Sequence, residues 1–274
     1  MAYKRILVIQ DISCVGQCSM TVALPILSAC GHETCILPTA MLSTHTGGFG
    51  KPAVVHFDET LDSVWKHWKE NEIIFDAILV GYLGSLKAIE TAKTILDEML
   101  TPGGIAIVDP AMADHGKLYS GFDDAYVEAM AGLCRKADIL IPNITEAAML
   151  SGQSYQDYLT EEYVREVLEF FAPKCVVLTG VGFAENQTGF MIRDGECLRH
   201  YSHSRIGKNY RGTGDMFAAC FTGALLQGKS LYDAARIAAD FVCMAIENTE
   251  KNPAHWYGVK FETVLGELSR LVAE

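Results

Sequence analysis

A glycine-rich stretch that contains one acid, Gly212-Thr213-Gly214-Asp215, directly precedes an apolar run that begins at Met216. Glycine adopts backbone dihedrals that are forbidden to other residues, so successive N–H groups here can point at one position. At the start of a helix such N–H groups bind anions, and the helix dipole strengthens the binding. A carboxylate there would repel a phosphate, but it is needed if it deprotonates a hydroxyl that attacks the phosphorus. The stretch therefore predicts a phosphotransferase centre, with Asp215 as the general base and the three residues before it as an anion hole.

A second polar motif, Pro142-Asn143-Ile144-Thr145-Glu146, follows a short apolar run. Carboxylate and amide oxygens at the end of a strand suit Mg²⁺, which keeps several waters and takes few direct protein ligands. In the alternative interpretation, Thr145 caps a short helix that ends near Leu150, and Glu146 only favours the dipole of that helix. We favour the metal role for Glu146.

The stretch from Gly223 to Ser230 matches the P-loop pattern at every position. A P-loop follows a strand, whereas the apolar residues from Met216 onward recur at helical spacing, which puts Gly223 inside a helix. We expect Gly228 to end that helix and Ser230 to begin the next one, with Asp233 completing a variant of the capping box. We therefore interpret the match as the junction of two helices.

The elements that must position these residues alternate between short apolar strands and longer helical segments. This alternation predicts right-handed βαβ units and a mainly parallel sheet that is covered by helices on both faces. Asp194-Gly195 predicts the turn of one late antiparallel hairpin. Since no linker or repeat interrupts the chain, we predict one domain over residues 1–274. The predicted strands are 6–9, 34–37, 77–80, 105–108, 139–141, 175–178, 189–193 and 196–201, and the predicted helices are 20–29, 85–100, 213–227, 230–248 and 261–272.

Residues 39–57 lack a regular apolar period and include the glycine-rich run His45-Thr46-Gly47-Gly48-Phe49-Gly50. An ordinary surface loop is one interpretation of this segment. Loops of this length without internal structure often act on a ligand, so we favour a small flap that covers the substrate.

A polar residue follows each of six predicted strands. In open parallel sheets, ligands bind beyond the carboxyl ends of the strands. The simplest interpretation is one crevice that all six residues line. They are Asp11, Thr39, Tyr82, Asp109, Asn143 and Thr179.

Charge and composition exclude several other classes of protein. The 274 residues carry a formal net charge of −12, which disfavours binding to nucleic acid or to an anionic membrane. No apolar run approaches the roughly 20 residues that span a bilayer, and the N-terminus does not resemble a signal peptide. The nine cysteines lack the paired spacing of a zinc site and are typical of a reducing compartment. We expect a cytoplasmic protein.

The motifs occur in the same order as in the ribokinase-like superfamily, and within it the chain most resembles the pyridoxal/pyridoxamine kinases. The resemblance implies a three-layer α/β/α fold with a central, mostly parallel sheet. The matching segments are residues 9–11 with Gly16, 43–47, 80–85, 109–114, Asn143 with Glu146, 179–180 and 212–215.

This resemblance implies ATP-dependent phosphorylation of the 5′-hydroxymethyl group of a vitamin B6 pyridine, and it also implies a homodimer. A role for a monovalent cation stays open. The pyridine site would include Asp11, Thr39, His45 and Tyr82. Asp109 and Glu146 would organise Mg²⁺ and its waters. The ATP site would include Asp114, Asn143, Thr179, Lys208, Arg211 and Asn248.

One departure from the family pattern concerns Asp11, because family members usually carry a serine at this position. The added charge suits a protonated pyridine nitrogen or an amine. It is also similar to an acid in the hydroxymethylpyrimidine kinases, although the glycine-rich first turn of that group is absent, with only Gly16 present. We favour the vitamin B6 substrate and keep hydroxymethylpyrimidine as the alternative. A sugar or nucleoside kinase and a non-catalytic ligand sensor are the remaining hypotheses.

Overall fold

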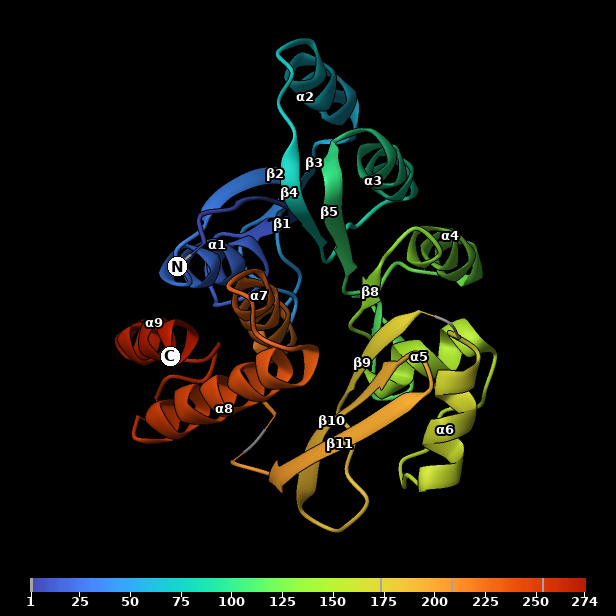
Figure 1. Cartoon of the computed structure of the whole chain (residues 1–274), viewed down its shortest axis with the longest axis vertical. Coiled ribbons are helices and arrows are strands. Elements are labelled where there is room, and N and C mark those ends of the chain that lie inside the picture. Colours follow the sequence, from blue (N-terminus) through green and yellow to red (C-terminus); the bar gives the residue numbers. More distant parts are fainter. Residues whose placement is uncertain (1, 173, 208, 253) are drawn as a thin grey trace.

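The computed structural model describes residues 2–172, 174–207, 209–252 and 254–274. A nine-stranded sheet of order β11-β10-β9-β8-β5-β4-β1-β2-β3 runs through these residues (Figure 1). Its strands are β1 (Arg5–Ser13), β2 (Glu33–Leu42), β3 (Val54–His56), β4 (Phe75–Val80), β5 (Leu100–Val108), β8 (Ile139–Leu140), β9 (Cys175–Thr179), β10 (Gln187–Asp194) and β11 (Cys197–Ser204). A separate small hairpin consists of β6 (Ala113–Asp114) and β7 (Lys117–Leu118).

The centre of the sheet is parallel, as predicted. β1 pairs in parallel with β2 and β4, and the parallel pairing continues through β5, β8 and β9. The predicted late hairpin is confirmed as β10–β11, in which Asp194 pairs with Cys197 next to the turn. Two further pairings are antiparallel, β9 with β10 and β2 with β3, so both edges of the sheet depart from the parallel pattern.

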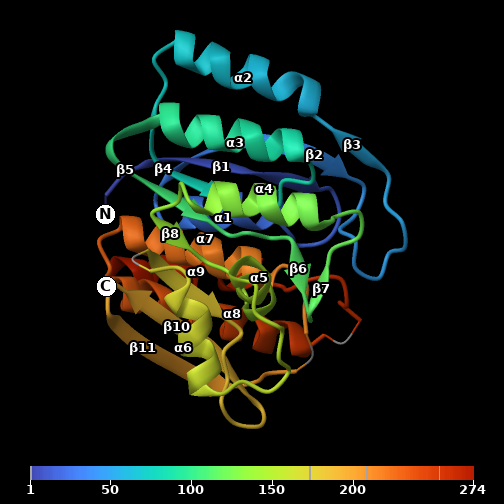
Figure 2. The same cartoon turned by 90° about the vertical axis from the view of Figure 1, so that its right-hand side faces the viewer.

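Helices cover both faces of the sheet and complete three layers (Figures 1 and 2). One apolar core lies between the sheet and α1, α7, α8 and α9, with Val22, Phe221 and Phe241 among its buried residues. The other lies under α2 to α6, with Ile89 and Val164 among its buried residues. The helices are α1 (Met20–Ala29), α2 (Asp58–Glu70), α3 (Leu86–Glu98), α4 (Asp124–Cys134), α5 (Ile144–Ser151), α6 (Glu161–Glu169), α7 (Thr213–Leu226), α8 (Leu231–Glu250) and α9 (Leu265–Ala273).

The junction of α7 and α8 confirms that the P-loop match is fortuitous. Gly223 lies inside α7, and Gly228 follows the helix with a φ of 91°. The Ser230 hydroxyl accepts the backbone N–H of Asp233 and so caps α8. No tight anion-binding loop exists in this segment.

The segment predicted as a flap is shorter than the sequence suggested. Residues 39–42 belong to β2, and β3 pairs with them in antiparallel fashion, with Ala40 opposite His56. Residues 43–53 remain as the connection between the two strands. The regular strand pattern was hidden because the side chains of β3 are all exposed and so lack apolar alternation.

No helix among the described residues is both long and apolar enough to cross a membrane.

Candidate active site

A cavity of about 760 Å³ lies at the edge where the parallel strands end. Five of the six residues predicted to line one crevice do line it, namely Asp11 within β1, Tyr82 after β4, Asp109 after β5, Asn143 after β8 and Thr179 at the end of β9. Thr39 is the exception, since it is fully buried within β2 and its hydroxyl lies 3.4 Å from the backbone oxygen of Tyr82. The parallel sheet therefore gathers the predicted residues, but Thr39 is structural.

The start of α7 forms the floor of this cavity. Gly212 precedes the helix with a φ of 79°, and a β-carbon at this position would lie 1.9 Å from the backbone oxygen of Gln17. Only glycine fits this close approach. The first N–H groups of an α-helix have no acceptor within the helix. Those of Thr213, Gly214 and Asp215 thus form the positive end of the α7 dipole at the cavity, which suits a phosphoryl group.

The Asp215 side chain lies beside these N–H groups and is held by the chain before α1. Its Oδ2 accepts the backbone N–H of Ser19 at 2.9 Å. Burial raises the pKa of Asp215 to about 7, the N–H of Ser19 opposes this shift, and the charge of Asp11 adds to it. A carboxylate with a pKa near the pH of the medium is well suited to accept a proton and release it again.

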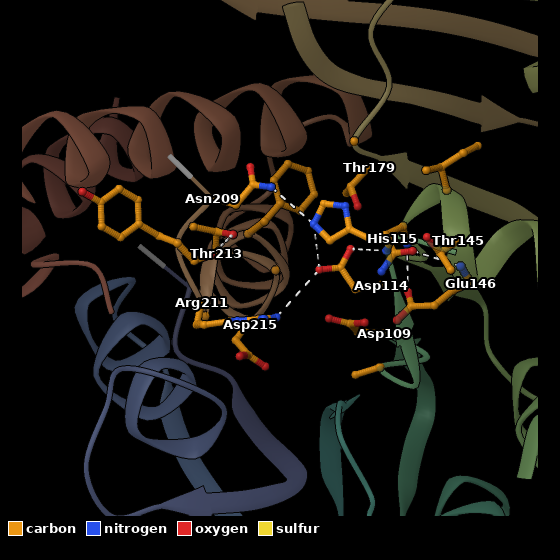
Figure 3. A pocket seen from close by; sticks show the side chains of 18 of the residues that line it. Asp109, Asp114, His115, Thr145, Glu146, Thr179, Asn209, Arg211, Thr213 and Asp215 are labelled. Carbon is orange, nitrogen blue, oxygen red and sulfur yellow. Dashed lines mark hydrogen bonds and ion pairs between the residues drawn. The ribbon is translucent and has the colours of Figure 1, made fainter. Parts of the chain in front are cut away.

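Asp109, which follows β5, approaches Asp215 from the other side of the cavity (Figure 3). Burial raises the pKa of Asp109 well above its usual value, and the nearby charge of Asp215 raises it further. Two carboxylates that share a buried cavity are stabilised in their charged form when a cation lies nearby. The pair therefore favours a bound cation close to the start of α7.

Glu146, which we expect to organise Mg²⁺ and its waters, is bonded to the protein backbone through both carboxylate oxygens. Its Oε1 accepts the N–H of Met112 at 3.1 Å, and its Oε2 accepts the N–H of Asn143 at 2.9 Å. Asn143 completes a capping box at α5, because its Oδ1 accepts the N–H of Glu146 and its Nδ2 donates to the backbone oxygen of Ala113. Both side chains face the cavity, but their polar atoms already have partners in the protein.

The fit to Mg²⁺ therefore depends on Asp109. No group of three or more His, Cys, Asp or Glu side chains in the described part of the chain is arranged to hold a metal by itself. Mg²⁺ commonly binds through one or two carboxylates, phosphate oxygens and waters. Asp109 fits this mode, and Glu146 fits it only through a water. A helix cap is present as well, with Asn143 rather than Thr145 as the cap of α5.

The opposite end of the cavity is lined by Asp11 and aromatic rings. Asp11 is 3% exposed, and its Oδ2 accepts the hydroxyl of Ser13 at 3.1 Å. Burial raises the pKa of Asp11, and the hydroxyls of Ser19 and Ser13 oppose the shift. Tyr82 stacks on Phe122 with 5.5 Å between ring centroids, and burial, with a smaller effect of Asp11, raises its pKa to about 12. This end suits a flat ring that donates a proton to Asp11.

His45 lines the same end, but both of its ring nitrogens are already bonded. Nδ1 accepts the N–H of Gly47 at 3.0 Å, and Nε2 donates to the backbone oxygen of Tyr257 at 2.8 Å. Phe49 packs against the rings of His45, Trp256 and Tyr257. His45 therefore joins the 43–53 connection to the C-terminal loop.

The residues predicted for the ATP site have three different outcomes. Asp114, Asn143, Thr179 and Arg211 line the cavity, whereas Lys208 lies outside the described residues. Asn248 is not among the lining residues, and its Nδ2 donates to the backbone oxygen of Lys260 and to the hydroxyl of Thr263, both at 2.8 Å. The α8 residues that line the cavity are Ala239, Val242, Cys243 and Ile246.

The geometry of α8 explains why Asn248, which was predicted for the ATP site, does not line the cavity. The lining residues of α8 follow the spacing of one helical face, and a residue two positions beyond Ile246 points to another side. Several functional neighbours were also missed, among them Ser19, His115, Tyr119 and Asn209. No sequence signal marks Ser19, since only the folded chain brings it to Asp215.

Comparisons with known proteins agree with this geometry. The family model described as phosphomethylpyrimidine kinase matches residues 29–259. The hydroxymethylpyrimidine/phosphomethylpyrimidine kinase of Haemophilus influenzae is 29% identical over 189 residues, which is 65% of this chain and 68% of that protein. The crystal structure of pyridoxal kinase from Lactobacillus plantarum has a TM-score of 0.90 at 35% identity and covers 98% of this chain and 97% of its own.

A third similar protein, from Bacteroides thetaiotaomicron, is described as a phosphomethylpyrimidine kinase and was crystallised with pyridoxal. It has a TM-score of 0.91 at 33% identity, and the match covers 97% of this chain and 95% of that chain. The similar proteins thus carry both substrate names.

Proposed function

The chain belongs to the family of phosphomethylpyrimidine and pyridoxal kinases, with their ribokinase-like α/β fold, and from this premise we propose that it transfers the γ-phosphoryl group of ATP to the 5′-hydroxymethyl group of a vitamin B6 vitamer. The observation that carries the proposal is the position of the Asp215 carboxylate. It lies beside the free N–H groups at the start of α7, between an aromatic end and an acidic end of one cavity.

The chain's own groups supply the proton transfer and the charge stabilisation. Asp215 accepts the proton of the substrate hydroxyl as its oxygen attacks the γ-phosphorus, and the bond between this phosphorus and the β–γ bridging oxygen of ATP breaks. The N–H groups of Thr213, Gly214 and Asp215 donate to the oxygens of the moving phosphoryl group. Positioning and electrostatic stabilisation of this kind account for most of the rate enhancement in phosphoryl transfer.

Magnesium fits the acidic end of the site, with Asp109 as the side chain available to hold it or its waters. When it is bound, Mg²⁺ neutralises charge on the phosphates of ATP. Glu146 supports this end indirectly, because it fixes the backbone of residues 112–113 and the start of α5.

The ring end supports an aromatic heterocycle as the substrate. Tyr82 offers a stacking surface, and stacking adds about 0.5–1.5 kcal/mol to the energy of burial. Asp11 has no cation among its bonded partners, which are serine hydroxyls. A ring that carries an N–H⁺ or an amino group supplies the missing donor.

Hydroxymethylpyrimidine is the second candidate substrate. It is favoured by the family model and by the Haemophilus influenzae relative, and its amino group is a suitable donor for Asp11. The resemblance to the Lactobacillus plantarum enzyme and the pyridoxal in the Bacteroides structure favour the B6 vitamer.

An assay of ADP release distinguishes these substrates. The protein is incubated with ATP, Mg²⁺ and, separately, pyridoxal, pyridoxamine, pyridoxine and hydroxymethylpyrimidine, and each phosphorylated product is identified by mass spectrometry. The Asp215→Asn variant is the matched control for contaminating kinases. We expect the highest kcat/KM with a B6 vitamer. A higher kcat/KM with the pyrimidine would replace the proposed substrate, and no turnover with any of them would refute the kinase proposal.

The homodimer stays a prediction from the resemblance. Light scattering coupled to size-exclusion chromatography tests it, with a mass of twice 30.0 kDa as the expected result.

A further inference from the structure

The β6–β7 hairpin places a histidine in a costly backbone conformation at the edge of the cavity. Asp114 pairs with Lys117, and the two residues between them, His115 and Gly116, have φ values of 49° and 73°. A two-residue turn with both φ values positive strongly favours Asn-Gly or Gly-Gly. Histidine occurs at positive φ more often than most side chains do, but it is less favourable there than glycine or asparagine. A strained residue that persists beside a ligand cavity indicates a function.

The hairpin is held so that the imidazole faces the cavity. The N–H of Gly116 donates to the hydroxyl of Thr145 on α5 at 3.1 Å, and the N–H of His115 donates to Oδ1 of Asp114 at 2.9 Å. The Nε2 atom of His115 lies 3.5 Å from Oδ2 of Asp114 and 3.3 Å from Nδ2 of Asn209 (Figure 3). The ring therefore spans the distance from the hairpin to the loop that leads into the anion hole.

The surroundings of this ring are rich in groups that bind phosphate. Nη1 of Arg205 donates to Oδ1 of Asn209 at 3.1 Å, and Nη1 of Arg211 lies 3.9 Å from Oδ2 of Asp114. All of these residues line the cavity together with the start of α7. The carboxylates on the cavity floor repel a triphosphate, so its binding depends on cations and N–H donors at this side.

The other histidines that line the described part of the cavity are engaged elsewhere. His45 uses both ring nitrogens to join the 43–53 connection to the C-terminal loop. His203 contacts Sγ of Cys243 on α8 and the backbone oxygen of Ser204. Of these three rings, only that of His115 lies between Asp114 and Asn209.

We propose that His115 is a further nucleotide-binding residue, which donates an imidazole N–H to a phosphate oxygen of ATP, and that its left-handed turn costs stability for the sake of this contact. The proposal rests on the kinase function above. On binding, the phosphate oxygen replaces Asn209 as the neighbour of the ring.

The test uses His115→Asn, which suits the turn but removes the ring. The matched control is Glu72→Asn, because Glu72 is exposed, has a φ of 55° and lies in the turn after α2, away from the cavity. We expect both variants to raise the midpoint of thermal unfolding by about 1–3 °C. Calorimetry should show about fivefold or greater weakening of ATP binding in His115→Asn only, because this variant loses a charge-assisted hydrogen bond to a phosphate oxygen. Adenosine has no phosphate, so its affinity should stay within about twofold of that of the original protein.

Unchanged ATP affinity in His115→Asn, or an equal loss for ATP and adenosine, would overturn the proposal. A drop in the unfolding midpoint with unchanged affinity would show that the ring only supports the fold. If circular dichroism shows that His115→Asn is misfolded, His115→Gly supplies the same comparison. Because binding is measured without turnover, failure of ATP to bind the original protein would refute the kinase function itself, whereas normal binding by the variant would refute only this inference.

Discussion

The backbone N–H of Ser19 donates to Oδ2 of Asp215 at 2.9 Å, across 196 residues of sequence. Ser19 has a φ of 52° and a ψ of −126°, a conformation that is typical of glycine. It immediately precedes α1, and Asp215 lies in the first turn of α7, so the packing of these two helices fixes the distance between donor and acceptor. The orientation of the proposed base thus depends on a backbone group of a strained residue.

Two substitutions of Ser19 separate the backbone donor from the side chain. Ser19→Gly keeps the N–H and suits the dihedral angles, so kcat should stay within about threefold and stability should rise by about 0.5–1 kcal/mol. Ser19→Pro removes the N–H, and kcat should fall at least about 100-fold because the base loses its orientation. Steady-state kinetics and urea denaturation measure both. Equal loss of kcat in the two variants would show that the hydroxyl, rather than the N–H, positions Asp215.

The close approach of Gly212 to Gln17 predicts a severe effect of one added methyl group. Gly212→Ala combines a φ of 79° with a contact of 1.9 Å, so the free energy of unfolding should fall by more than about 1 kcal/mol and phosphoryl transfer should be lost. Gly266→Ala in α9 meets no atom within 4 Å and should leave stability unchanged or raise it by up to about 1 kcal/mol. Urea denaturation compares them, and similar stability of the two variants would contradict the tight turn at Gly212.

Asp109 and Glu146, at the acidic end of the cavity, should respond differently to the loss of their charge. Glu146→Gln leaves one of the bonded N–H groups without an acceptor, so stability should fall by about 1–3 kcal/mol while the Mg²⁺ dependence of turnover changes little. Asp109→Asn also removes a buried carboxylate, but this change leaves no bonded backbone N–H group of the described residues without an acceptor. Its stability should be kept, but the Mg²⁺ concentration for half-maximal activity should rise at least about tenfold.

Activity titrated against Mg²⁺ decides between these roles. If Glu146→Gln shifts the Mg²⁺ requirement as strongly as Asp109→Asn does, then Glu146 holds the metal directly, and its hydrogen bonds to the backbone must open in the active complex.

The raised pKa of Asp215 also predicts how stability depends on pH. The carboxyl binds its proton more tightly in the folded protein, with a pKa of about 7, than in the unfolded chain, whose value is near 3.8. Its effect therefore favours the fold at low pH and is lost as the pH rises through 7. Asp215→Asn should raise the free energy of unfolding at pH 8 relative to the original protein and leave it nearly unchanged at pH 4. Urea denaturation measures these values. If Asp215→Asn had a lower free energy of unfolding than the original protein at pH 8, the folded protein would prefer the charged form.

The periodic parts of the fold were predictable from the sequence, because burial on both faces imposes apolar runs and helical spacing. The helix at residues 20–29 and the strand near residues 175–178 are examples, and each agrees with the structure to within a residue. The predicted elements did not include α2, α4 and α6. In α2, only Leu61 and Trp65 are buried, so the sequence of this helix shows too few apolar positions to reveal a helical period.

Roles that depend on backbone partners were not predictable. The spacing of Asn143 and Glu146 is the same for a metal site and for a capping box, and only the positions of the N–H groups distinguish them. Asn248 lies on a helix that does border the cavity, but the sequence does not say which face does so. Ser19 and His115 gain their importance from backbone conformations that their residue types disfavour.

The most direct test of the general-base role is the pH dependence of kcat for the original protein and for Asp215→Asn between pH 5.5 and 9. With a pKa of about 7 for Asp215, kcat should fall about tenfold per pH unit well below 7 and level off above it. Asp215→Asn should be at least about 100-fold slower at pH 8 and should lose this pH dependence, while ADP still binds. A variant that keeps more than about a tenth of the original kcat, with the same pH profile, would contradict the proposed mechanism.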